Sequence, residues 1–92
     1  MVIQVIGQSF DVGEALTEHV KTTLDKKFSK FSQDIMGASV VFTQAPHKKV
    51  SATIKLQVKG PDLFAKSEGD DAYQAFATTL SEIETQFKKI KK

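Results

Sequence analysis

The sequence lacks cysteine, arginine and any long apolar run, and each absence excludes a class of protein. Without cysteine, the chain cannot hold a disulfide, a thiolate metal site or a cysteine nucleophile, and this fits a reducing cytoplasm. No apolar stretch approaches the roughly 20 residues that a membrane-spanning helix needs. Because the first residues also carry no basic leader, we expect no signal peptide and no membrane association, and we expect the protein in the cytoplasm.

On the basic side, the charge of the chain is carried by lysine alone. Thirteen lysines and eleven acidic residues give a formal net charge of +2 over 92 residues. Residues 1–46 carry four lysines and five acids, whereas residues 47–92 carry nine lysines and six acids. A chain of this length forms one small core, so we expect a single domain spanning residues 1–92. Its mildly basic C-terminal half permits contact with a polyanion but is far from histone-like.

Apolar periodicity predicts four strands and two helices. We expect the strands at residues 2–6, 38–45, 50–58 and 63–68. The first helix is capped by Asp11 or Gly13, and Gly37 falls in the loop after it. Its buried stripe consists of Leu16, Val20, Leu24, Phe28 and Phe31. Asp70, as cap, and Asp71 open the second helix. The stripe of that helix consists of Tyr73, Phe76, Ala77, Leu80, Ile83, Phe87 and Ile90.

The order of these elements, β-α-β-β-β-α, predicts the fold. A β-α-β crossover is right-handed and leaves its strands parallel, so the first two strands should be parallel neighbours. Short turns join the last three strands, which should form an antiparallel meander. Apolar and polar residues alternate from Val50 to Lys59, so one face of the sheet is wet. We therefore expect an α+β fold, a two-layer sandwich in which both helices pack on the other face of a four-stranded sheet.

Groups of residues that would support catalysis or metal binding are nearly absent. His19 flanks the first helical stripe, His47 lies in a turn, and the two share no ligand spacing. The seven serines lie outside any nucleophile-elbow pattern. Asp70 and Asp71 are adjacent and would point about 100° apart on a helix, which favours capping over metal binding. We expect no enzyme activity, no metal, no cofactor and no small-molecule substrate.

Lysines gather toward the C-terminal end of each predicted helix. If the helices run side by side, one patch could form from Lys26, Lys27, Lys30, Lys88, Lys89, Lys91 and Lys92. Lys48 and Lys49 lie in a turn, and Lys55 and Lys59 belong to the wet face of the sheet. For each lysine, solubility is the alternative explanation. No run of exposed aromatics suggests base stacking, so nucleic-acid contacts would come from the helices and involve backbone and shape.

Several segments resemble the ribosome hibernation promoting factor family, which includes the ribosome-associated inhibitor proteins. The resemblance extends over essentially all 92 residues. Its most specific segment runs from Ala65 to Ala75, where an aspartate, a small residue and Tyr73 open the final helix as in the family. The other matching segments are Ile3-Gln4-Val5-Ile6-Gly7, Glu14-Ala15-Leu16 with Val20, and Ser51-Ala52-Thr53-Ile54.

The resemblance implies a function and a site. Members of the family bind the small ribosomal subunit in the channel used by messenger RNA and transfer RNA, inhibit translation, and preserve inactive ribosomes under stress or in stationary phase. Basic residues along both helices contact ribosomal RNA. By position, this role falls on Lys26, Lys30, Lys88, Lys89, Lys91 and Lys92, with Lys27 and Lys49 as secondary candidates. A short-form member that is monomeric when free is implied. Whether it pairs ribosomes or silences single ones stays open.

The sequence departs from the family pattern at five positions, three of which are basic in the family. Thr17 stands in place of an arginine in the first helix, and Glu82 and Thr85 stand in place of basic residues in the last helix. Ala72 replaces a common methionine, and Gly13 replaces the usual threonine or serine cap. Fewer basic contacts weaken RNA binding, and lysine cannot supply the bidentate fork of arginine. The alternative function is a regulatory module of the same fold that binds structured RNA or a protein away from the ribosome.

Overall fold

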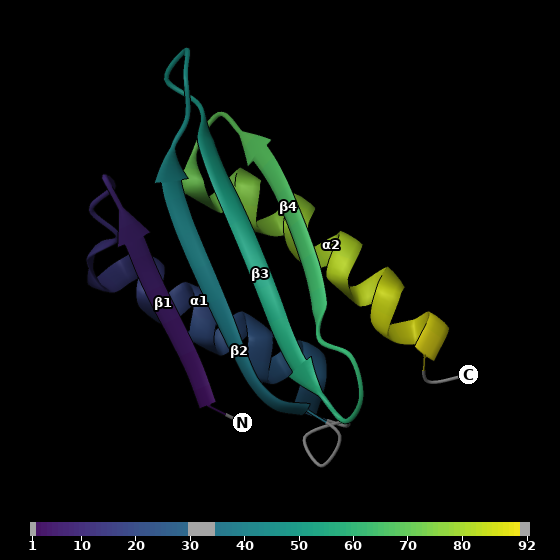
Figure 1. Ribbon diagram of the computed structural model, residues 1–92. Coiled ribbons are helices and arrows are strands. Elements are labelled where there is room, and N and C mark those ends of the chain that lie inside the picture. Colours follow the sequence, from purple (N-terminus) through teal and green to yellow (C-terminus); the bar gives the residue numbers. More distant parts are fainter. Residues whose placement is uncertain (1, 30–34, 91–92) are drawn as a thin grey trace.

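The computed structural model describes residues 2–29 and 35–90 and contains the six predicted elements in the predicted order. They are β1 (Val2–Gln8), α1 (Gly13–Phe28), β2 (Ile35–Gln44), β3 (Val50–Val58), β4 (Leu63–Gly69) and α2 (Ala72–Ile90). Figure 1 shows the four strands side by side, with both helices running behind them. The β-α-β-β-β-α order expected from the sequence is therefore confirmed.

The sheet is mixed and has the strand order β1-β2-β3-β4. β1 and β2 are parallel, with Gln4 opposite Ser39, as a crossover through α1 requires. β3 pairs antiparallel with β2 on one side and with β4 on the other. Ile54 of β3 thus lies opposite Val40 of β2 and opposite Ala65 of β4. The parallel pair and the antiparallel meander predicted from the connections are both confirmed, and β1 and β4 form the two edges of the sheet.

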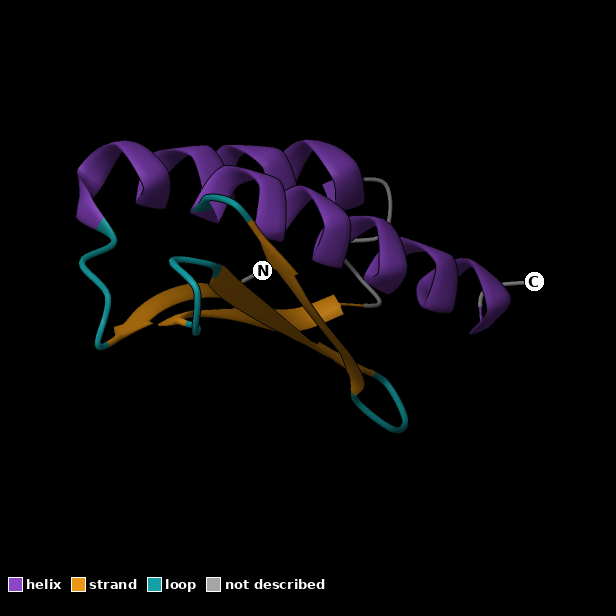
Figure 2. Ribbon diagram, turned by 90° about the horizontal axis from the view of Figure 1, so that it is seen from above, coloured by secondary structure: helices purple, strands orange, loops and turns teal. Residues whose placement is uncertain are grey.

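Both helices pack on the same face of the sheet, which gives the protein two layers (Figure 2). β3 contributes five core side chains that are at most 7% exposed: Val50, Ala52, Ile54, Leu56 and Val58. Phe28 of α1 meets Phe87 of α2 edge to face, with ring centroids 5.6 Å apart. The predicted α+β sandwich is confirmed, and this aromatic contact holds the last turns of the two helices near each other.

The start of β2 differs from the prediction. β2 begins at Ile35, so Gly37 lies inside the strand and not in the preceding loop. The register of β2 against β3 shifts between Ile35 and Gly37, and a Cβ at Gly37 would lie 3.1 Å from the carbonyl oxygen of Val2. Glycine is therefore favoured by an irregularity in the strand and by the close approach of β1. A loop glycine and a strand glycine look alike in the sequence.

The start of α1 and part of the α2 stripe also differ from the predictions. Val12 occupies the N-cap position of α1, and no side-chain hydrogen bond caps the helix, so neither Asp11 nor Gly13 is the cap. The sequence places Tyr73 and Ala77 in a buried stripe, but both are exposed, Tyr73 by 46%. They lie on the flank of α2, beside the line of residues that meets the sheet. The stripe residue Phe31 lies outside the described residues.

The cap of α2 is the second aspartate of the pair and not the first. Oδ1 of Asp71 accepts a hydrogen bond of 2.8 Å from the backbone N–H of Gln74. Oε1 of Gln74 in turn accepts a hydrogen bond of 2.7 Å from the backbone N–H of Asp70, which resembles a capping box. The carboxylate of Asp70 is thereby free to pair with a lysine from another turn. Both aspartates support the start of the helix, as expected, but through different bonds.

Candidate nucleic-acid interface

The two helices run in the same direction, so their C-terminal turns lie at the same end of the molecule (Figure 1). The last turn of α1 carries Lys26 and Lys27, and the last turn of α2 carries Lys88 and Lys89. All four residues are exposed, and we call them the helix-end lysine cluster. The other contacts predicted at these ends lie outside the described residues: Lys30, Lys91 and Lys92.

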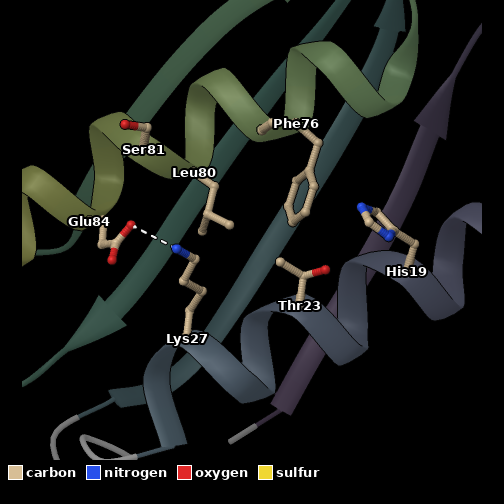
Figure 3. Close-up of a pocket in the computed structure, with 8 residues that line it drawn as sticks. His19, Thr23, Lys27, Phe76, Leu80, Ser81 and Glu84 are labelled. Atoms are coloured by element: carbon tan, nitrogen blue, oxygen red, sulfur yellow. Dashed lines mark ion pairs between the residues drawn. The ribbon is translucent and has the colours of Figure 1, made fainter.

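Glu84 joins the two halves of the helix-end lysine cluster. Its Oε1 lies 3.5 Å from Nζ of Lys27 in α1, and its Oε2 lies 3.8 Å from Nζ of Lys88, one turn later in α2. Figure 3 shows the pair of Lys27 and Glu84 spanning the space between the helices. The carboxylate is the least exposed of the three groups, with a side chain 27% exposed. Lysines of both helices therefore converge, around a negative charge that offsets part of theirs.

Sequence reasoning missed Glu84, although one signal was present. Its spacing of four residues from Lys88 is the spacing of an ion pair on one helix face. Its contact with Lys27 depends on the distance between the two packed helices, which no pattern in the sequence indicates. The residue that sequence reasoning singled out, Glu82, is exposed, and its Oε1 accepts a hydrogen bond of 3.1 Å from Oγ of Ser67 in β4.

A groove between α1 and α2 leads away from the pair of Lys27 and Glu84 (Figure 3). It has a volume of about 290 Å³ and is lined by His19, Thr23, Lys27, Phe76, Ala77, Leu80, Ser81 and Glu84. The His19 ring lies with its centroid 5.0 Å from that of Tyr73 and 5.9 Å from that of Phe76, which confirms its place beside the core. Among the described residues, no group of three or more acidic, histidine or cysteine side chains is arranged to hold a metal ion.

Lys49 lies at the opposite end of the molecule from the helix-end lysine cluster, in the connection between β2 and β3 (Figure 1). Its Nζ forms an ion pair with Oδ1 of Asp70, just before α2. The hydrogen bond that the Lys49 ammonium donates to Asp70, followed by the negative charge of Asp70, raises the pKa of Lys49 above the ordinary lysine value. The structure therefore does not bring this secondary candidate together with the other predicted contacts.

The open face of the sheet, opposite the helices, carries a separate set of lysines. Nζ of Lys55 lies 3.6 Å from Oδ2 of Asp62 and 5.7 Å from the centre of the Phe64 ring. Phe64 is 58% exposed, and Lys66 is exposed two residues further along β4. Lys59, which the sequence places on this face, follows the end of β3 and lies in its connection to β4. Lys55 and Lys66 lie on the strands, on the face away from the helices, whereas the connection that holds Lys59 lies at the end of the molecule where both helices end (Figure 1).

These features define a small α+β protein with a lysine-bearing surface at one end of its helix layer. The chain belongs to the family described as Sigma 54 modulation protein / S30EA ribosomal protein, which matches residues 3–92. The resemblance to hibernation factors is thereby confirmed, and proteins of this family are ribosome-associated factors without enzymatic activity. In the part of the chain that the structure describes, no helix has the length and apolar character to cross a membrane.

Two solved structures share the fold. The N-terminal domain of Protein Y from Thermus thermophilus matches with a TM-score of 0.85 at 26% identity, over 98% of this chain and 99% of that one. A ribosomal subunit interface protein from Coxiella burnetii matches with a TM-score of 0.83 at 26% identity, over 99% of this chain and 98% of that one. The comparison with curated proteins found no match. The chain is thus similar along nearly its whole length to a protein described by its place at the ribosome.

Proposed function

We propose that this protein is a ribosome hibernation factor. It binds the small ribosomal subunit in the channel of messenger RNA and transfer RNA, inhibits translation, and preserves inactive ribosomes under stress or in stationary phase. It acts in the cytoplasm and needs no cofactor. The family match over residues 3–92 carries the proposal, because it makes the protein ribosome-associated. The likeness to a ribosomal subunit interface protein supports the same conclusion.

The helix-end lysine cluster is the surface proposed to contact ribosomal RNA. Ammonium groups neutralise phosphates and release counterions, so each lysine contact adds to the salt dependence of binding. Lysines on two helices can contact separate segments of a folded RNA, which suits recognition of its shape. Lys30, Lys91 and Lys92 follow the cluster in sequence and are proposed to extend it. Lys49, paired with Asp70 at the other end of the molecule, is proposed to contribute less.

Three positions that are basic in the family hold side chains that bond within this chain. The hydroxyls of Thr17 and Thr85 donate hydrogen bonds of 2.8 and 3.0 Å to backbone carbonyls one turn earlier in their helices. Glu82 accepts its hydrogen bond from Ser67. None of these groups offers a positive charge to a phosphate. We therefore propose that this protein binds ribosomal RNA with lower affinity than members of the family that are basic at these positions.

Sedimentation with purified small ribosomal subunits tests the proposal. At low salt the protein is expected to migrate with the subunit through a sucrose gradient, and it should dissociate as salt increases because the contacts are ionic. Subunits preloaded with messenger RNA and initiator transfer RNA should not bind it, and cell-free translation should slow when it is added. A protein that stays at the top of the low-salt gradient contradicts the proposal. Equal affinity for an unrelated structured RNA would favour the alternative, a regulatory RNA-binding module.

A further inference from the structure

The two edges of the sheet differ in how they are protected against pairing with another strand. Edge strands expose N–H and C=O groups, and proteins commonly protect such edges with charged side chains. β4 carries two charged residues, Lys66 and Glu68. β1 carries none, since it reads Val-Ile-Gln-Val-Ile-Gly-Gln and the first charged residue of the chain is Asp11. The outer side of β1 is therefore a neutral edge of seven residues, and β2 is its one neighbour among the described strands.

The side chains of β1 are apolar on both faces of the sheet. Val2 is 69% exposed and Ile6 is 41% exposed, and both point to the open face. Ile3 and Val5 alternate with them, point to the helix side, and are only partly buried against the core. A strand added along this edge would cover part of all four side chains. Apolar surface and unpaired backbone groups thus occur together at this edge.

The residue order of β1 is nearly symmetric about Gln4. When two β1 strands are placed antiparallel and centred on Gln4, Val2 of each copy lies opposite Ile6 of the other, and Ile3 lies opposite Val5. Each apolar side chain then meets an apolar partner on its own face, and the two Gln4 side chains meet at the centre. A shift of two residues keeps the faces but places Gln4 opposite Val2 or Ile6, so the match is lost.

We propose that β1 pairs antiparallel with β1 of a second copy of this chain, which joins two four-stranded sheets into one. Because β2 occupies the inner side of β1, both copies meet through the same outer side, and a two-fold axis between identical edges makes the strands antiparallel. In the register centred on Gln4, odd-numbered residues lie opposite odd-numbered residues and even-numbered opposite even-numbered. The residues whose backbone N–H and C=O groups point away from β2 therefore face each other in the two copies, so these groups can form hydrogen bonds. An edge of seven residues buries little area, so the dimer is weak and forms at high protein concentration.

The proposed contact is separate from the proposed RNA surface. The helix-end lysine cluster lies at the C-terminal ends of the helices, whereas β1 runs along one side of the sheet (Figure 1). Salt weakens RNA binding, but it does not weaken a contact between uncharged apolar strands. The dimer departs from the monomer that the sequence led us to expect. Its absence would leave the ribosome proposal untouched, because the two surfaces are tested by different measurements.

Sedimentation equilibrium of the full chain over a range up to millimolar concentration tests the pairing. The weight-average mass is expected to rise toward twice the monomer mass, at low and at high salt alike. Val2→Lys with Ile6→Lys places lysine opposite lysine twice and should keep the mass at the monomer value. Val2→Glu with Ile6→Lys places glutamate opposite lysine twice and should restore the dimer, in a now salt-sensitive form. Phe64→Lys, a matched change of an exposed apolar residue at the other edge, should leave the dimer unchanged.

A single cysteine tests the register directly, since the chain has none of its own. Gln4→Cys places two thiols opposite each other at the axis, within the Cα separation that a disulfide needs, and should give a covalent dimer under mild oxidation. Gln57→Cys, also exposed but on β3, is the control and should stay monomeric. A chain that remains monomeric at millimolar concentration overturns the proposal. So does a dimer that persists in the double-lysine variant, because it would use another surface.

Discussion

The two faces of the sheet are formed by the same strands but differ in their effect on stability and on the proposed RNA contact. In β3, Ile54 and Leu56 point to the helices and are completely buried, whereas Lys55 between them points to the open face, against Asp62 and Phe64. Contacts on the covered face fix the positions of α1 and α2, and hence of the helix-end lysine cluster. On the open face no described element packs on the strands (Figure 2). Stability and the proposed RNA contact therefore belong to the helix layer, and the open face is expected to tolerate substitution.

Truncating one phenylalanine on each side gives the largest expected difference between the faces. Phe76 is 1% exposed and lies 6.4 Å from Phe42 between ring centroids, so Phe76→Ala should lower the free energy of unfolding by about 3–5 kcal/mol. Phe64→Ala on the open face should cost about 1 kcal/mol or less, mainly the contact with Lys55. Urea denaturation measures both values. Similar losses for the two variants would mean that the open face is covered in solution.

Charge reversal on each face gives the next largest difference. Lys26→Glu with Lys88→Glu and Lys89→Glu should lower the affinity for small subunits by at least about a hundredfold at low salt, and should reduce the slope against salt by about 2–3. Binding curves at several salt concentrations measure both quantities.

The matched control reverses three lysines that lie away from the helix ends. Lys48→Glu with Lys55→Glu and Lys66→Glu changes the net charge by the same amount, and it should lower the affinity less than about fivefold, through the long-range field alone. Thermal unfolding should show that both variants stay folded. A larger loss from the control variant would place the RNA surface away from the helix ends.

The fold could be predicted from the sequence because an element that is buried on one face has apolar residues at regular intervals. Val50 to Val58 alternate in the sequence, and the structure buries the predicted side of this strand. The failures occur where several structures satisfy the same local pattern. Asp70 and Asp71 are both acceptable caps in the sequence, but in the structure Asp71 caps the helix and Asp70 pairs with Lys49 from a different turn. Tyr73 fits the spacing of the buried stripe but lies at its margin, where the position of α1 decides exposure.

The candidate site was predictable only in part, for a related reason. The lysines at each helix end are local features, and parallel helices on one face bring them to the same end of the molecule. The pair of Lys27 and Glu84 connects residues far apart in the sequence, so it depends on the distance between two helix axes. The separation of Lys49 from the cluster likewise follows from the direction of β2 and not from any motif.

Removing the carboxylate within the helix-end lysine cluster should have a smaller effect, and one of opposite sign. Glu84→Gln releases Lys27 and Lys88 from their shared partner, so the affinity for small subunits at low salt should rise up to about fivefold, because exposed ion pairs contribute about 0.2–1 kcal/mol. The salt dependence should become steeper. Glu18→Gln, the same charge change in the N-terminal half of α1, is the control and should raise the affinity less. An unchanged affinity in Glu84→Gln would contradict the proposal that Lys27 and Lys88 contact RNA.

The smallest expected effect concerns Lys49, at the far end from the cluster. Because Asp70 raises its pKa, the stabilising contribution of the pair is fully present below the ordinary lysine pKa and is lost as pH rises through the raised value. Asp70→Asn should return the pKa of Lys49 toward the ordinary value, which an NMR titration of its side chain measures. Asp71→Asn should leave that pKa unchanged, because Asp71 bonds to the backbone of Gln74. An Asp70→Asn variant that alters neither the pKa of Lys49 nor the affinity for small subunits would show that the ion pair affects neither property. An increase in affinity as large as that of Glu84→Gln would show that the RNA surface extends to both ends of the molecule.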